Sequence, residues 1–164
     1  MSKIHNTANP VDEAAEVNRA QSEHRATWMG LIYDEMKKEG LDAEAIIRRA
    51  IRRCGRINGE NLKKKCVEPI SGEEFRKVFP SELGVKTFNM HPINADKDNV
   101  RVDFHYCALV NAWQKLGFDD DTCSLLCDMA MEGDRGIAET MGLKLELSET
   151  IAQGCETCKL RFHR

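Results

Sequence analysis

The hydrophobic period changes within one stretch, Val100-Arg101-Val102-Asp103-Phe104-His105-Tyr106-Cys107-Ala108-Leu109-Val110-Asn111-Ala112-Trp113. Up to Phe104, apolar and polar residues alternate, which is typical of a strand with one buried face. From Tyr106 to Leu116 the apolar residues lie three or four apart, as in an amphipathic helix, and Gly117 follows as a helix end. The stretch therefore predicts a strand that leads directly into a helix.

Helical patterns precede this stretch. Residues 12–39 carry apolar side chains three or four positions apart. Asp42 caps a second helix, and Gly55 and Gly59 either divide that helix in two or weaken it. Ser71-Gly72-Glu73-Glu74 is expected to begin a short third helix, and Pro80 is expected to end it.

Strands are predicted in four places, at residues 85–89, 100–105, 143–147 and 158–162. The turn-rich residues 93–99 join the first two strands as an antiparallel hairpin. A helix capped by Asp119 or Asp120 precedes the last two strands. The glycine-flanked residues 133–136 mark either a break or a tight approach between elements.

This order of elements predicts an α+β fold, with N-terminal helices followed by a small, mostly antiparallel sheet on which helices pack. A chain of 164 residues fits a single domain. Within it we expect a flexible tail at 1–11, a helical part at 12–80, and an α+β part at 81–164 that carries the functional site.

The composition is that of a soluble globular protein. Hydrophobic residues make up 41% and charged residues 31% of the chain, and no apolar run approaches the roughly 20 residues of a membrane helix. The N-terminus is polar and has no secretory signal core, and the seven cysteines are an odd number. We therefore expect a cytoplasmic protein with free thiols and no membrane contact.

Basic residues gather in one segment. Between Arg48 and Lys65, eight arginines and lysines accompany a single acid, Glu60. This segment either guides an anionic small molecule to the protein or is simply a solvated helix face. The aromatic content of 6% offers little surface for base stacking, so no nucleic-acid partner is expected.

The strand–helix junction is the candidate site. His105 and Cys107 lie two residues apart there, and the N-terminus of a helix favours a thiolate or a bound anion. The two residues are either a base and a nucleophile or a metal-binding pair. Alternatively, His105 binds a carboxylate and Cys107 fills the core.

Other reactive residues follow in the chain. Cys155-x-x-Cys158 has metal or redox spacing, but no second such pair accompanies it. Cys127 lies on an apolar helical face, where packing is the usual explanation. Asp128 and Asp134 are candidates for a general base or an orienting group, and Asp134 is equally suited to capping a helix.

From His105 onward the chain resembles the L-2-amino-thiazoline-4-carboxylic acid hydrolase family. The resemblance covers about sixty residues and lies in Tyr106-Cys107-Ala108-Leu109-Val110-Asn111-Ala112-Trp113, Leu126-Cys127-Asp128, Gly133-Asp134-Arg135-Gly136-Ile137-Ala138, Thr150-Ile151-Ala152-Gln153-Gly154 and Cys158-Lys159-Leu160-Arg161-Phe162. It implies a small cytoplasmic hydrolase that opens a cyclic isothiourea on a bacterial route toward cysteine. Two positions depart from the expected pattern, since Ala108 stands where proline is expected and Cys155 is additional.

The resemblance and the chemistry of the residues suggest a mechanism. Cys107 thiolate or water attacks the electrophilic ring carbon, while Asp134 or Asp128 transfers a proton and His105 shuttles it. A substrate-binding group of Arg52, Arg56 and Trp113 is expected, with an arginine holding the substrate carboxylate. This scheme requires no cofactor.

Two alternatives remain open. In the first, Cys107, Cys127 and Cys158, together with His105, bind zinc or iron, and a metal-bound water attacks the substrate. In the second, the chain is a non-enzymatic small-molecule or metal-binding sensor domain with a cysteine-lined cavity. The sequence does not predict the oligomeric state.

Overall fold

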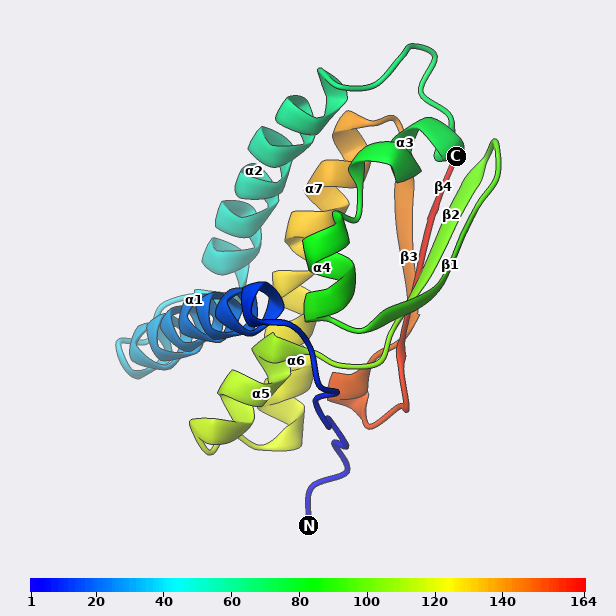
Figure 1. Ribbon diagram of the computed structural model, residues 1–164. Coiled ribbons are helices and arrows are strands. Elements are labelled where there is room, and N and C mark those ends of the chain that lie inside the picture. Colours follow the sequence, from blue (N-terminus) through cyan, green and yellow to red (C-terminus); the bar gives the residue numbers. More distant parts are fainter.

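The computed structural model describes residues 1–164 and has the predicted α+β class (Figure 1). In chain order the elements are α1 (Glu13–Lys38), α2 (Ala43–Lys63), α3 (Gly72–Val78), α4 (Glu82–Thr87), β1 (Met90–Ala95), β2 (Asn99–Phe104), α5 (Ala108–Lys115), α6 (Asp120–Ala130), α7 (Glu132–Thr140), β3 (Lys144–Glu149), the 3-10 turn η1 (Ile151–Gln153) and β4 (Cys158–His163).

Short polar side chains begin the helices. In each of five helices, an aspartate or serine at the N-cap accepts a hydrogen bond from the backbone N–H three residues further on; these caps are Asp12, Asp42, Ser71, Ser81 and Asp119. Such bonds satisfy N–H groups that have no partner within the helix. The predicted Asp42 cap of α2 is confirmed, and Asp119 rather than Asp120 caps α6.

The sheet is antiparallel with strand order β1-β2-β4-β3. Val100 and Val102 on β2 and Leu160 and Phe162 on β4 are buried, so the two central strands supply the core face of the sheet. Figure 1 shows the helices on one side of this sheet. The predicted strands in the C-terminal part of the chain are thus confirmed.

The prediction of a strand over 85–89 is wrong. These residues belong mostly to α4, which Ser81 caps, and the first strand of the hairpin is β1, at 90–95. Thr87 is buried in α4, where its hydroxyl donates to the Leu83 carbonyl. Alternation over five residues does not separate a strand from a short helix, and the serine cap decided the outcome.

α2 is one continuous helix, because its glycines serve packing rather than a break. A Cβ added to Gly55 would lie 2.1 Å from the backbone oxygen of Gly133 on α7, and one added to Gly59 would lie 2.0 Å from Thr140 Oγ1. The absence of side chains lets α2 and α7 approach this closely. Residues 133–136 therefore form a tight approach within α7 rather than a break.

The N-terminal segment contacts the rest of the molecule. Ile4 belongs to the hydrophobic core with 6% of its surface exposed. Ser2 Oγ and the Lys3 backbone N–H each donate to the Asp120 carboxylate over 2.6 Å. The residues we expected to be a flexible tail thus make specific contacts, which the polar character of the segment did not indicate.

None of the helices combines the length and the apolar character needed to cross a membrane.

Candidate active site at the start of α5

Cys107 lies where β2 gives way to α5. It is the N-cap residue of α5, with extended backbone angles of φ −130° and ψ 108°. No side-chain hydrogen bond caps the helix, but the N–H groups of Leu109 and Val110 lie near the sulfur and favour its charged form. Burial has the larger effect and raises the pKa of the Cys107 thiol, so the group is protonated at neutral pH.

Asp134, in the first turn of α7, is the carboxyl group whose pKa best suits a general acid or base. Burial raises its pKa to about 6, although its own backbone N–H and the charges of Arg25 and Arg135 act in the opposite direction. No other side chain binds this carboxyl group through a hydrogen bond or an ion pair. Its charge in turn raises the pKa of Cys107, so the two groups act on one another.

Arg25 on α1 is a residue that the sequence analysis missed. Arg25 is exposed, and its charge lowers the pKa of both Cys107 and Asp134. The neighbouring residue Ala26 accepts a hydrogen bond from α5 over 2.9 Å, and this contact brings α1 alongside α5. No ion pair or hydrogen bond engages Arg25. Nothing in the charged pattern of α1 distinguished it from the other basic residues there.

Two further cysteines lie close to this position. Burial raises the pKa of Cys127 on α6 and raises that of Cys158 on β4 to about 12, and charge on Cys107 would raise both further. Cys158 Sγ accepts a hydrogen bond from the Ile151 N–H over 3.3 Å. These properties belong to protonated core thiols.

The structure does not bring three metal ligands together. No group of three or more His, Cys, Asp or Glu side chains is arranged to hold a metal ion. Cys107, Cys127 and Cys158 therefore do not form the metal set considered above, and His105 does not complete one. Cys155 is half-buried and free.

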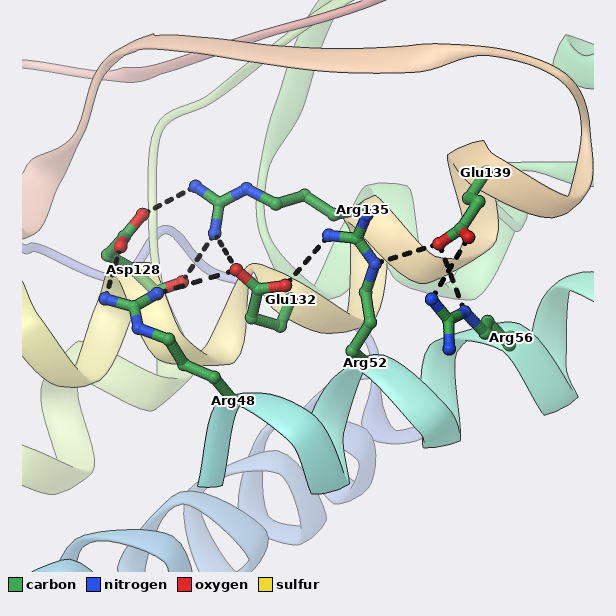
Figure 2. A network of polar contacts seen from close by, with 7 residues as sticks. All are labelled: Arg48, Arg52, Arg56, Asp128, Glu132, Arg135 and Glu139. Atoms are coloured by element: carbon green, nitrogen blue, oxygen red, sulfur yellow. Dashed lines mark hydrogen bonds and ion pairs between the residues drawn. The ribbon is translucent and has the colours of Figure 1, made fainter. Parts of the chain in front are cut away.

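Asp128, Arg52 and Arg56 belong instead to an ion-pair network between α2, α6 and α7. Figure 2 shows this network, which comprises Arg48, Arg52, Arg56, Asp128, Glu132, Arg135 and Glu139. Asp128 lies 2.5 Å from Arg135 and 2.7 Å from Arg48. Burial opposes ionisation of Asp128, but the hydrogen bonds from these two arginines outweigh it and its pKa is lowered.

The two arginines predicted to hold substrate are bound by acids of α7. Arg52 lies 2.8 Å from Glu132 and 3.0 Å from Glu139, and Arg56 lies 3.1 Å from Glu139. Hydrogen bonds from Arg56 and Arg52 lower the pKa of Glu139. The guanidinium groups of both arginines thus join α2 to α7, and their role in substrate binding stays a prediction.

The other two predicted residues are also engaged elsewhere. His105 Nε2 lies 2.7 Å from the His91 carbonyl oxygen, and the two imidazole rings stack with centroids 3.9 Å apart. Trp113 is fully buried, and its Nε1–H donates to the Ala26 carbonyl oxygen over 2.9 Å. Trp113 is thus a core residue with no surface for a substrate, and His105 is directed toward β1.

Two surface hollows have linings that do not include the candidate site residues. One, of about 400 Å³, is lined by Lys63, Glu68, Pro69, Ile70, Met141, Gly142 and Arg164. The other, of about 350 Å³, is lined by Asn9, Pro10, Val11, Asp12, Val85, Lys86, Asn89 and Met90. Neither is lined by Cys107 or Asp134, both of which are partly buried.

Comparison with known proteins gives one match in sequence and one in fold. The family model described as L-2-amino-thiazoline-4-carboxylic acid hydrolase matches residues 19–162. No curated protein matches the chain in sequence. Among solved structures, the chain is similar to trafficking protein particle complex subunit 3 from Naegleria fowleri, which was crystallised covalently bound to palmitic acid. The two are 15% identical with a TM-score of 0.51, over 88% of this chain and 95% of that one, so the likeness concerns the fold.

Proposed function

This chain belongs to the L-2-amino-thiazoline-4-carboxylic acid hydrolase family, and from that premise we propose that it opens the ring of a carboxylate-bearing cyclic isothiourea or amidine by hydrolysis. One observation carries the proposal beyond the family. A thiol at a helix N-terminus is influenced by the charges of a partly buried carboxyl group with a pKa of about 6 and of an exposed arginine without an ion pair. These three groups match the nucleophile, acid–base and anion-binding roles that the reaction needs.

The proposed reaction has two steps. Cys107 thiolate attacks the ring carbon between the sulfur and the two nitrogens, the bond from that carbon to the ring sulfur breaks, and the sulfur leaves as a thiolate. Water then adds to the same carbon and the bond to Cys107 breaks. The product is a carbamoyl-cysteine that contains the atoms of one water molecule, and Cys107 is regenerated.

Asp134 supplies the proton transfers in this scheme. Because burial keeps Cys107 protonated at neutral pH, the thiol needs a base, and ionised Asp134 is the group that can accept its proton. The carboxylic acid formed in this way then protonates the ring nitrogen or the leaving sulfur. A pKa of about 6 suits both directions of transfer near neutral pH.

Arg25 takes the role that the sequence had assigned to the α2 arginines. A guanidinium without a protein partner can bind the substrate carboxylate through two parallel hydrogen bonds. Its charge also favours the thiolate form of Cys107 at the moment of attack. The scheme needs no cofactor.

The test is turnover of L-2-amino-thiazoline-4-carboxylate by the wild-type chain and by Cys107→Ser. Ring opening releases a thiol, which a chromogenic disulfide detects, and mass spectrometry shows the addition of one water molecule. We expect Cys107→Ser to lose activity by a factor on the order of a thousand, because loss of a nucleophile removes the covalent route.

Cys54→Ser, at an exposed cysteine, is the matched control and should behave as wild type. An inactive wild-type protein, tested also on other carboxylated cyclic amidines, would overturn the proposed activity. Full activity in Cys107→Ser would leave the activity standing and assign the attack to water.

A second candidate function is covalent binding of an acyl chain without turnover. The observation that favours it is the similar fold of a protein that was crystallised covalently bound to palmitic acid. In this reaction the Cys107 thiol would displace coenzyme A from palmitoyl-coenzyme A and form a thioester. Intact-protein mass spectrometry after incubation with palmitoyl-coenzyme A tests it, since a hydroxylamine-sensitive adduct on Cys107 alone would support this function.

A further inference from the structure

The N-terminal segment reaches the candidate nucleophile. Residues 2–4 are anchored by the two bonds to Asp120 and by the burial of Ile4 in the core. Two residues later, the side chain of Asn6 meets the backbone of Cys107, which is 101 positions away in the sequence. The contacts of residues 2–4 therefore place the Asn6 side chain at the start of α5.

Asn6 binds both polar groups of the Cys107 backbone. The Cys107 N–H donates to Asn6 Oδ1 over 2.9 Å, and Asn6 Nδ2 donates to the Cys107 carbonyl oxygen over 2.8 Å. The same carbonyl oxygen also accepts the first bond of α5, from the Asn111 N–H over 3.1 Å. The primary amide carries the donor and the acceptor that this pairing requires, whereas a carboxylate can only accept.

The two hydrogen bonds from Asn6 restrain the backbone of Cys107, and the backbone conformation of Cys107 determines the position of its sulfur. Cys107 has the extended angles of an N-cap residue, which direct its side chain toward the N–H groups at the start of the helix. Rotation about either backbone angle would move the sulfur away from the Leu109 and Val110 N–H groups. The two hydrogen bonds from one side chain oppose such rotation.

We propose that Asn6 is a positioning residue that fixes the Cys107 thiol at the N-terminus of α5, and that residues 2–6 are therefore part of the active site. The role in turnover rests on the proposed function. The effect on the thiol does not, because its reactivity can be measured without substrate.

The groups that act on the Cys107 sulfur come from several elements. Arg25 on α1 and Asp134 on α7 are the charged ones, and the thiols of Cys127 and Cys158 face the same region. Tyr106 is the adjacent titratable residue. None of these lies on the N-terminal segment, so a substitution of Asn6 by alanine leaves the charges around the sulfur unchanged and alters its placement.

The experiment measures alkylation of Cys107 by iodoacetamide as a function of pH, with peptide mass spectrometry to follow this cysteine alone. In Asn6→Ala we expect the reactivity midpoint to move to higher pH, since the sulfur loses helix N–H groups that favour the thiolate. The rate of Cys107 alkylation at pH 8 should fall about fivefold, which corresponds to the loss of one hydrogen bond from a helix N–H group to the sulfur. Turnover, if present, should show a fall in kcat that exceeds any change in KM.

Asn6→Asp provides the second variant. It retains the acceptor for the Cys107 N–H but cannot donate to the carbonyl oxygen, and its charge disfavours the thiolate, so the midpoint should rise further. Asn94→Ala is the matched control, because Asn94 is exposed on β1 and its side chain makes no hydrogen bond.

An alkylation profile of Asn6→Ala that coincides with the wild-type profile, in protein with wild-type thermal stability, would overturn the inference. A shifted profile in a protein that does not hydrolyse cyclic isothioureas would overturn the proposed function and leave the positioning role in place. The two failures are thus distinguishable.

Discussion

The interface between α2 and α7 and the corner around Cys107 both contain arginines and carboxylates, but they differ in whether these charges have partners. At the interface every arginine drawn in Figure 2 meets at least one carboxylate. At the corner, Arg25 and Asp134 form no ion pair. The sequence had favoured the interface arginines for substrate binding because they are concentrated there.

The pKa shifts of the carboxyl groups express the same difference. The interface arginines lower the pKa of Asp128 and Glu139, so these acids remain ionised and structural. Burial without a partner raises the pKa of Asp134 to about 6. A group that is held away from its ordinary pKa and keeps its hydrogen-bonding capacity free is suited to chemistry. Charges with protein partners therefore have a structural role here, and the charges without such partners, on Asp134 and Arg25, mark the candidate site.

The largest expected effect concerns the packing of the interface. Gly55→Ala should lower the free energy of unfolding by about 3 kcal/mol, because the new methyl group would lie 2.1 Å from the Gly133 backbone oxygen and the helices must separate. Urea denaturation followed by circular dichroism measures this loss.

Gly133→Ala is the control from the opposite side of the same contact. Its methyl group would meet only Ile51, at 3.6 Å, so stability should stay the same or rise by up to about 1 kcal/mol through better helix propensity. If Gly55→Ala proved as stable as Gly133→Ala, the close approach of α2 and α7 would be incorrect.

The next effect concerns the unpaired carboxyl group at the corner. Asp134 has a pKa of about 6 in the folded chain against an ordinary value of 3.8, so the folded state holds its proton more tightly than the unfolded state. Stability from this group is present below pH 4 and is lost as the pH rises through 6. Asp134→Asn should therefore be more stable than wild type at pH 8 by about 2 kcal/mol and equal to it at pH 4.

Unfolding in urea at the two pH values measures this difference. Asp121→Asn is the control, because it removes an exposed carboxylate from the first turn of α6 and should slightly lower stability at pH 8. A stability gain at pH 8 equal in the two variants, or none in Asp134→Asn, would show that the Asp134 carboxylate is solvated rather than buried.

Most of the fold could be predicted from the sequence because its signals are local. The Asp42 cap of α2, the helix after Cys107 and the strands of the C-terminal part follow from side chains within a few positions of each element. The strand expected at 85–89 was wrong because five alternating residues satisfy two periods, and only the Ser81 cap favours the helix. The continuity of α2 depended on Gly133, a contact with a distant segment.

The candidate site could be predicted only in part. The junction motif indicated Cys107, and the glycine-flanked segment indicated Asp134. Arg25 and Asn6 reach the site from α1 and from the N-terminal segment, so no spacing in the sequence connects them to Cys107. The ion pairs of Arg52 and Arg56 could not be predicted, because a basic helix has the same sequence pattern whether its partners are substrate or the acids of α7.

The smallest expected effects are those of two substitutions in the ion-pair network, one at a mostly buried glutamate and one at a more exposed glutamate. Glu132 is 15% exposed and lies within 3.5 Å of Arg48, Arg52 and Arg135, so Glu132→Gln should lower the free energy of unfolding by about 1 kcal/mol. Glu139 is 45% exposed and binds two arginines, and Glu139→Gln should lower it by less than about 0.5 kcal/mol. Both losses should shrink in 1 M salt, which urea denaturation at two salt concentrations would show.

These variants also test whether the network is only structural. If Arg52 and Arg56 serve to join α2 to α7, then Glu139→Gln and Arg56→Gln should leave the KM for a carboxylated substrate unchanged, while Arg25→Gln should raise it. A large rise in KM for Arg56→Gln, with KM unchanged in Arg25→Gln, would reverse the assignment. It would mean that an arginine leaves Glu139 to bind the substrate. Ion-paired arginines in this protein would then serve substrate binding rather than only the packing of α2 against α7.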